Sequence, residues 1–211
     1  MTNGVEAEQW LLWTERLRAI AQTGRAYSID PYDRERYVEL DAMAQQMQAA
    51  LLQTTPGSLG GRFELDGGYP TPKVEVRAGV FEGERILLVR EESDGRWALP
   101  GGWADQQISP AGNAEKEVRE ETGLIVEAVR LVALLDHSGH TYRPQRLEHV
   151  YRLLFLCERR GGELSTSLET TDARFFALDD LPELSLNRTA PRELELLRTH
   201  AADPERRSWF D

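Results

Sequence analysis

The sequence lacks the features of secreted, membrane-spanning and disulfide-stabilised proteins. It contains one cysteine, Cys157, so no disulfide can form within the chain, and this favours a reducing compartment. It contains no apolar run of about 20 residues, the length that a membrane-spanning helix needs. Its first ten residues include two acids and no base, whereas a secretory signal begins with basic residues. We therefore expect a cytoplasmic protein that spans no membrane.

Positive charge is also scarce. The 25 Lys and Arg residues stand against 36 Asp and Glu residues, which gives a formal net charge of −11. A protein that follows the phosphates of duplex DNA normally presents a broad basic surface, so we expect no such partner here, while a local basic groove stays open. The remaining composition, 40% hydrophobic and 29% charged, is typical of globular proteins.

Two amphipathic helical segments open the chain. In each, apolar residues recur at alternating intervals of three and four, and Asp30-Pro31 is typical of the start of the second helix. These segments predict a small helical hairpin over residues 1–55. Residues 56–72 are rich in glycine and proline, which predicts a linker. Residues 73–211 then combine strand and helix patterns, so the expected fold class is α+β.

The predicted hairpin needs cover for its apolar stripes. About fifty residues bury too little surface to be stable alone, so the stripes pack either on the rest of the chain or on a second copy. Two-fold dimers are the commonest closed assembly, and we expect a homodimer formed through these helices. A DNA-binding role is disfavoured, because residues 1–55 hold five basic against eight acidic side chains.

Three glutamates share one face of a short helix. Ser109-Pro110 predicts the start of this helix and Gly123 its end. At about 100° per residue, Glu117, Glu120 and Glu121 fall within about 100° of arc. Such carboxylates repel one another by about 0.2–0.5 kcal/mol for an i, i+4 pair, and this conflict indicates a functional site. Oxygen ligands favour Mg²⁺ or Mn²⁺; a solvated acidic face is the alternative.

The same segment resembles the Nudix box, Gly-x5-Glu-x7-Arg-Glu-U-x-Glu-Glu-x-Gly-U, in which U is aliphatic. Gly102 and residues 116–124 match its spacing, and the flanking residues 99–103, Leu-Pro-Gly-Gly-Trp, are also typical. Two positions depart: Ile108 stands where the box has its first Glu, and Lys116 where it has Arg. These two positions commonly interact in the family, and the consequence of replacing them stays open.

The rest of the chain resembles a bacterial Nudix hydrolase subfamily with an N-terminal helical extension. The resemblance rests on the N-terminal helices, on residues 69–74 and on residues 184–188. Members are described as nucleotide-sugar, ADP-ribose or CDP-choline pyrophosphatases. The resemblance implies an α/β/α sandwich with a mixed sheet behind the helical hairpin. It also implies a Mg²⁺-dependent hydrolase that cleaves the diphosphate of a small nucleotide-type substrate, a nucleoside diphosphate linked to another group, X.

The resemblance further implies the residues of the site. Glu117, Glu120 and Glu121 are expected to bind Mg²⁺ with the backbone carbonyl of Gly101 and to serve catalysis, Glu117 alternatively by orienting or deprotonating the attacking water. Further candidates, for contacts with the substrate, are Arg77, Trp103, Arg143 and Glu169. The two arginines would bind phosphate oxygens, the tryptophan would stack on a base, and Glu169 would contact metal or water. Each also has an ordinary role in packing or at a charged surface.

Two questions stay open at this level. A Nudix-like domain can instead act as a non-catalytic ligand-sensing module, and the complete set of three glutamates favours the enzyme. The box specifies the diphosphate chemistry, whereas loops outside it select X. The sequence therefore leaves ADP-ribose, CDP-choline, related compounds and RNA 5′ ends as alternatives.

Overall fold

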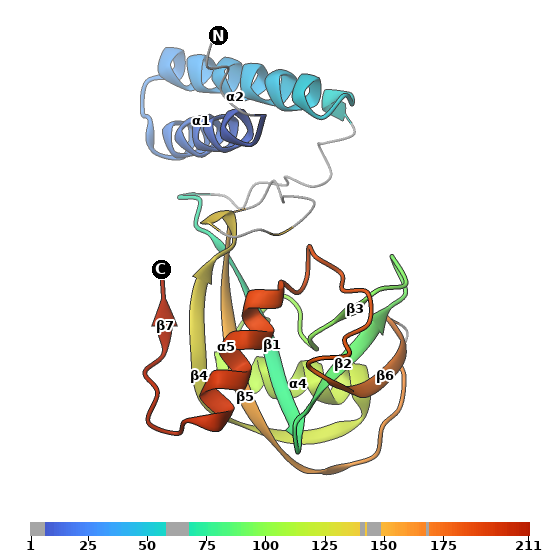
Figure 1. Cartoon of the computed structure of the whole chain (residues 1–211). Helices are drawn as coiled ribbons and strands as arrows, with labels where there is room; N and C mark the ends of the chain where they lie inside the picture. Colours follow the sequence, from blue (N-terminus) through green and yellow to red (C-terminus); the bar gives the residue numbers. More distant parts are fainter. Residues whose placement is uncertain (1–6, 58–67, 140–141, 143–148, 168) are drawn as a thin grey trace, which may run out of the picture. The chain divides into compact units, whose positions relative to one another are not determined.

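The computed structural model describes residues 7–57, 68–139, 142, 149–167 and 169–211. The chain divides into two compact units, Met1–Pro72 and Lys73–Asp211 (Figure 1). Within the described residues, no helix combines the length and hydropathy that crossing a bilayer requires.

The first unit is a pair of helices, α1 (Ala7–Tyr27) and α2 (Pro31–Leu51). The Asp30 side chain caps α2 by accepting a hydrogen bond from the backbone N–H of Tyr32 at 2.8 Å, and Pro31 occupies the first turn. A buried ion pair joins the helices, with Arg18 Nε 2.9 Å from Asp41 Oδ1. These contacts confirm the predicted helical hairpin.

The second unit is built on one mixed sheet. Its strands are β1 (Lys73–Glu82), β2 (Arg85–Glu91), β3 (Trp97–Ala98), β4 (Leu124–Asp136), β5 (Val150–Gly162), β6 (Thr170–Ala177) and β7 (Trp209–Phe210). The order is β3-β2-β1-β5-β4-β7, and β6 pairs with β2. The β1–β5 and β4–β7 pairs are parallel and the others antiparallel. A short 3-10 turn, η1 (His137–Gly139), follows β4.

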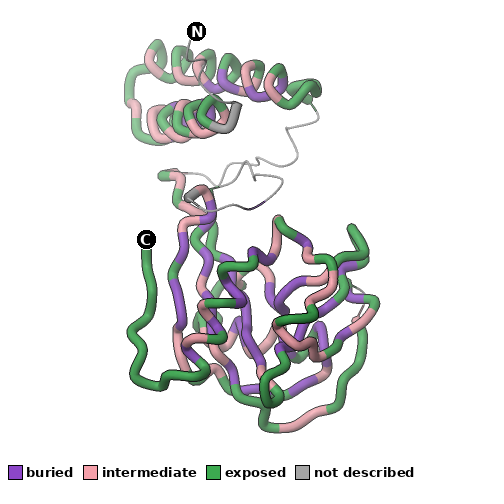
Figure 2. The backbone as a smooth tube through the Cα atoms, viewed as in Figure 1, coloured by how far each residue is buried: buried purple, intermediate pink, exposed green. Residues whose placement is uncertain are grey.

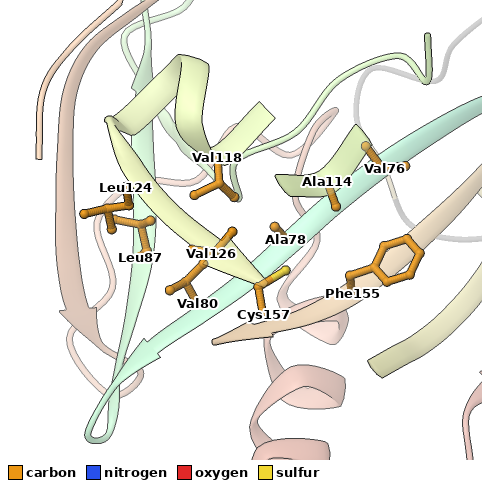
Figure 3. Packing of buried hydrophobic residues seen from close by; sticks show 10 residues of the cluster. All are labelled: Val76, Ala78, Val80, Leu87, Ala114, Val118, Leu124, Val126, Phe155 and Cys157. Carbon is orange, nitrogen blue, oxygen red and sulfur yellow. The ribbon is translucent and has the colours of Figure 1, made fainter. Parts of the chain in front are cut away.

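Two helices cover opposite faces of this sheet. On one face, α4 (Pro110–Thr122) packs through Ala114 and Val118 against alternate residues of β1, the cluster drawn in Figure 3. On the other face, α5 (Pro191–Ala202) packs through Leu194 and Leu197 against residues of β2, β4 and β5. Both faces are therefore buried, and the buried stretches follow the central strands (Figure 2). This arrangement confirms the predicted α/β/α sandwich.

The single cysteine belongs to the core. Cys157 lies on β5, is 3% exposed, and packs in the cluster beneath α4 (Figure 3). Burial raises the pKa of its thiol to about 12, and the charge of Glu115 adds to the effect. Because the thiolate is the reactive form, this side chain acts as an apolar packing residue.

Candidate active site

One hollow gathers most of the residues predicted for the site. It is about 660 Å³ in volume and lies where β1, the loop after β3, α4 and the segment before β6 meet. It is lined by Glu75, Arg77, Glu91, Gly101, Gly102, Trp103, Asp105, Lys116, Glu117, Glu120, Glu121, Ser167, Glu169 and Arg188. Seven of the eight candidates named from the sequence are among these residues. The eighth, Arg143, lies outside the described residues.

The loop before α4 runs beside β1 and forms one wall. The backbone N–H of Val76 donates to Gly102 O at 2.9 Å, and Ala104 donates from its N–H to Val74 O at 2.9 Å. Gly101 has φ +144°, and a Cβ there would lie 2.1 Å from Val76 O. Only glycine fits so close to the strand. Packing against β1 therefore requires a glycine at position 101, in the loop that also resembles that of the Nudix family.

Arg77 holds this loop from within the protein. Its side chain is 2% exposed, and Nη1 donates to the carbonyls of Leu99 at 3.0 Å and Gly101 at 2.6 Å. Its Nη2 forms an ion pair with Glu75. The sequence predicted a contact with phosphate oxygens. The structure instead directs this guanidinium to the backbone of the loop.

The three glutamates differ in exposure. Glu121 is 7% exposed, and its Oε2 accepts a hydrogen bond from the N–H of Gly101 at 3.0 Å. Glu117 is partly buried beneath Gly102, whereas the side chain of Glu120 is 53% exposed. Burial raises the pKa of Glu121 to about 8 and raises the pKa of Glu117. The inner carboxyl groups therefore carry an electrostatic cost that a nearby cation would relieve.

The structure shows the surroundings of the two positions that depart from the box. Ile108 is 40% exposed and contributes no charge. Lys116 lies among carboxylates, with Nζ 2.8 Å from Glu120 Oε2, 3.2 Å from Asp105 Oδ2 and 3.7 Å from Glu117 Oε1. Asp105 thus supplies a carboxylate for Lys116, three residues before the position where the box has its first Glu.

The side chains fit a hard divalent cation by their chemistry. In the described part of the chain, no group of three or more His, Cys, Asp or Glu side chains is arranged closely enough to hold a metal ion. Glu117, Glu120, Glu121 and the Gly101 carbonyl nevertheless offer only oxygen donors at the hollow, and the innermost carboxyl is held out of water. Such donors are the ligands that Mg²⁺ and Mn²⁺ prefer.

Two further candidates line the rim of the hollow. Trp103 is 44% exposed, and Lys73 Nζ lies 5.3 Å from the centroid of its ring. Glu169 lies in the segment before β6, where its N–H bonds Ser167 Oγ at 3.1 Å. Their placement is compatible with the contacts predicted for them, and those contacts stay predictions.

Four charged residues of the hollow were not singled out from the sequence: Glu75, Glu91, Asp105 and Arg188. Glu91 ends β2 and is 6% exposed, and Arg188 Nε lies 3.2 Å from its Oε1. The available signal was an acid two residues after the apolar run 86–89, which favours a buried and therefore paired carboxylate. Its partner could not be found locally, because Arg188 is distant in the chain.

Comparison with known families and proteins agrees with this geometry. Residues 71–199 match the model of the NUDIX domain, and residues 8–60 match that of the UDP-X-like, N-terminal oligomerisation domain. A Bacillus subtilis (strain 168) protein named "Putative ADP-ribose pyrophosphatase YjhB" is 41% identical over 203 residues, which are 96% of this chain and 97% of the relative.

Solved structures show the same similarity. The crystal structure of a UDP-X diphosphatase is 31% identical and covers 98% of this chain and 100% of its own, with a TM-score of 0.62. That of an ADP-ribose pyrophosphatase from Streptococcus suis 89-1591 is 42% identical and covers 67% of this chain and 100% of its own, with a TM-score of 0.61. The NUDIX domain model matches more than half of the chain, and α4 carries the box with its acidic face. The chain therefore belongs to the Nudix hydrolase family.

Proposed function

We propose that this protein is a divalent-cation-dependent pyrophosphohydrolase that cleaves the diphosphate of a nucleoside diphosphate linked to another group, X. The observation that carries the proposal is the meeting of Glu117, Glu120, Glu121 and the Gly101 loop in one hollow. Two relatives that match nearly the whole chain are named as an ADP-ribose pyrophosphatase and a UDP-X diphosphatase, and these names support the same substrate class. ADP-ribose-like and CDP-choline-like compounds are the candidates.

Each part of the site has a role in this proposal. Glu117, Glu120 and Glu121 would hold Mg²⁺, or Mn²⁺, with the Gly101 carbonyl. The bound cation neutralises charge on the diphosphate and lowers the pKa of water. Arg77 fixes the loop that presents this carbonyl, and the Gly101 N–H fixes Glu121. Most of the catalytic effect in phosphoryl chemistry comes from such positioning and charge neutralisation.

The remaining candidates concern the water and the substrate. Glu117 orients or deprotonates the attacking water, because its carboxyl group is partly buried in the hollow. Trp103 offers an exposed ring on which a base can stack. Glu169 contacts metal or water from the segment before β6. Arg143 stays a candidate for phosphate binding from outside the described residues. For Arg77 we replace the phosphate contact with the positioning role.

A substrate screen tests the function. ADP-ribose, CDP-choline, UDP-sugars and RNA with 5′ diphosphate or cap structures are incubated with and without Mg²⁺, and products are resolved by mass spectrometry in ¹⁸O-labelled water. We expect Mg²⁺-dependent hydrolysis of a small nucleoside diphosphate compound to a nucleoside monophosphate, with the label showing which phosphorus is attacked. Tight binding of these compounds with no turnover would favour the ligand-sensing module instead.

Residues 8–60 match the UDP-X-like, N-terminal oligomerisation domain, and we propose that the first unit forms a homodimer through α1 and α2. Trp10, Trp13 and Ile20 lie along α1 and are 38%, 45% and 41% exposed. The two indole rings meet edge to face with centroids 5.2 Å apart. Such an apolar stripe on a helix indicates a surface that another helix covers.

Oligomeric state tests this surface in the full chain. We expect light scattering to give twice the chain mass for the wild type and a shift toward one chain mass for Trp13→Glu, because a charge at an apolar contact must be desolvated. The matched control is Ile29→Glu, which changes a residue 96% exposed between the two helices and should leave the mass unchanged. A wild-type protein of one chain mass would contradict the proposal.

A further inference from the structure

The charge of the hollow poses a problem for substrate binding. Seven acidic residues line it and only three basic ones, Arg77, Lys116 and Arg188. A diphosphate brings further negative charge, and its oxygens need hydrogen-bond donors beyond those that a cation can supply. A basic side chain of the hollow whose N–H groups are not already bonded within the protein is therefore the one that can bind the diphosphate.

Two of the three basic residues are already engaged. Arg77 is buried and directs its terminal nitrogens to Glu75 and to the carbonyls of the loop. Lys116 has three carboxylate oxygens within 3.7 Å of Nζ. Moving either side chain to a phosphate would leave carboxylates or carbonyls without their donors.

Arg188 is differently placed. Its side chain is 27% exposed, with Nε 3.2 Å from Glu91 Oε1, and Nη1 donates to Ser93 Oγ at 3.3 Å. In the described part of the chain, Nη2 makes no hydrogen bond. Because the guanidinium is planar and rigid, the two contacts fix its orientation, and the two N–H groups of Nη2 stay available as donors on a side chain that lines the hollow.

The backbone beneath Arg188 is built to hold it there. The N–H groups of Arg188 and Thr189 both donate to Ser185 O at 2.8 Å, which closes a tight turn. Ser185 is fully buried and its Oγ bonds Asp94 Oδ2 at 2.7 Å. The Leu99 N–H donates to Thr189 Oγ1 at 2.8 Å, so the turn is tied to the loop that leads into Gly101.

We propose that Arg188 binds the diphosphate of the substrate by donating from Nη2 to a non-bridging phosphate oxygen. The ion pair with Glu91 and the turn at Ser185 hold the guanidinium in place before the substrate arrives, which lowers the entropy cost of binding. Arg188 is then the residue that selects a diphosphate over an uncharged nucleoside. This inference rests on the proposed function, because it takes a nucleoside diphosphate compound as the ligand.

Binding calorimetry in Mg²⁺ tests the inference without requiring turnover. The probes are ADP, inorganic pyrophosphate and adenosine, and the variants of the full chain are Arg188→Ala and Arg188→Lys. We expect the Kd for ADP and for pyrophosphate to rise about ten- to hundredfold in Arg188→Ala, the range for losing a charged hydrogen bond, with no change for adenosine. Arg188→Lys keeps the charge without the fork and should fall between.

The matched control is Arg96→Ala, which removes an arginine that directly precedes β3 and pairs with Glu183; neither residue lines the hollow. It should leave every Kd unchanged. If Arg188→Ala does not fold, judged by circular dichroism, Arg188→Lys carries the comparison. Unchanged ADP and pyrophosphate binding in the folded variant, or no binding of either probe to the wild type, overturns the inference.

Failure of the proposed function gives a different result. If the screen shows no hydrolysis but pyrophosphate binding still depends on Arg188, the enzymatic assignment is wrong and the assignment of Arg188 stands. If hydrolysis is found and KM does not respond to Arg188→Ala, the enzymatic assignment stands and the role of Arg188 is wrong.

Discussion

Glu120→Gln is expected to lower kcat by about 10²- to 10³-fold, the range for losing one group that stabilises charge in the transition state. Glutamine keeps the shape of the side chain and removes the negative charge that would bind the cation. The side chain is 53% exposed and its main partner is Lys116, a surface ion pair worth about 0.3–0.5 kcal/mol. Steady-state hydrolysis in Mg²⁺ measures the loss, and thermal unfolding should be nearly unchanged.

Glu127→Gln is the matched control for this change. It removes one negative charge from an exposed glutamate on β4 that pairs with Arg160, away from the hollow. Its kcat should equal that of the wild type. Full Mg²⁺-dependent activity in Glu120→Gln would show that the cation site has been misplaced.

Arg152→Met is expected to lower the free energy of unfolding by about 3–5 kcal/mol, the usual cost of breaking a buried ion pair. The side chain is 0% exposed, with Nη2 2.9 Å from Glu75 Oε2 and Nη1 2.9 Å from Glu193 Oε1. Burial lowers the pKa of this guanidinium, and the charges of Glu193 and Glu75 outweigh that effect and hold it above its ordinary value. Methionine fills a similar volume but leaves both carboxylates without this partner.

Removing the Arg152 guanidinium should also disturb the candidate active site, because the two are connected through Glu75 and Arg77. Glu75 pairs with both Arg152 and Arg77, and Arg77 holds the Gly101 carbonyl. Glu193 also accepts a hydrogen bond from the Ala190 N–H at 2.7 Å and so caps α5. One buried network thus connects the loop of the hollow to the start of α5.

Urea denaturation measures the effect against Arg198→Met. Arg198 lies on α5 and pairs with Glu195, but its side chain is 57% exposed. Exposed pairs contribute about 0–1 kcal/mol, so this control should change the free energy of unfolding little. A loss below about 1 kcal/mol in Arg152→Met would show that the buried network is not required for stability.

Local sequence signals predicted the helices well, because caps act over a few residues. Ser109 accepts a hydrogen bond from the Gly112 N–H at 3.0 Å, and Gly123 has φ +74°, so α4 begins and ends where the sequence indicated. Asp30 acts in the same way for α2. The periodicity of the box helix then placed its three glutamates on the face that meets the hollow.

Strand lengths were predicted less completely. The apolar patterns of the sequence cover only residues 126–135 and 150–157, whereas β4 spans Leu124–Asp136 and β5 spans Val150–Gly162. The two strands pair with each other out to Leu124 and Gly162, beyond the apolar pattern. The strand β7 was not predicted, because two exposed residues carry no periodicity and form a strand only by pairing with β4.

The sequence by itself determined the family resemblance, the helical hairpin, the acidic face of α4 and the glycine beside it, because each depends on residues close together in the chain. Only the tertiary structure decided how the charges are shared. In the folded protein Arg77 donates to the Gly101 carbonyl, and Asp105 forms an ion pair with Lys116. Arg188 contacts Glu91 and Ser93. Arg188 and Ser93 are 95 positions apart, and β3 pairing with residues 183–185 brings them together. Such a pairing depends on chain segments that meet only after folding, so no local pattern could contain it.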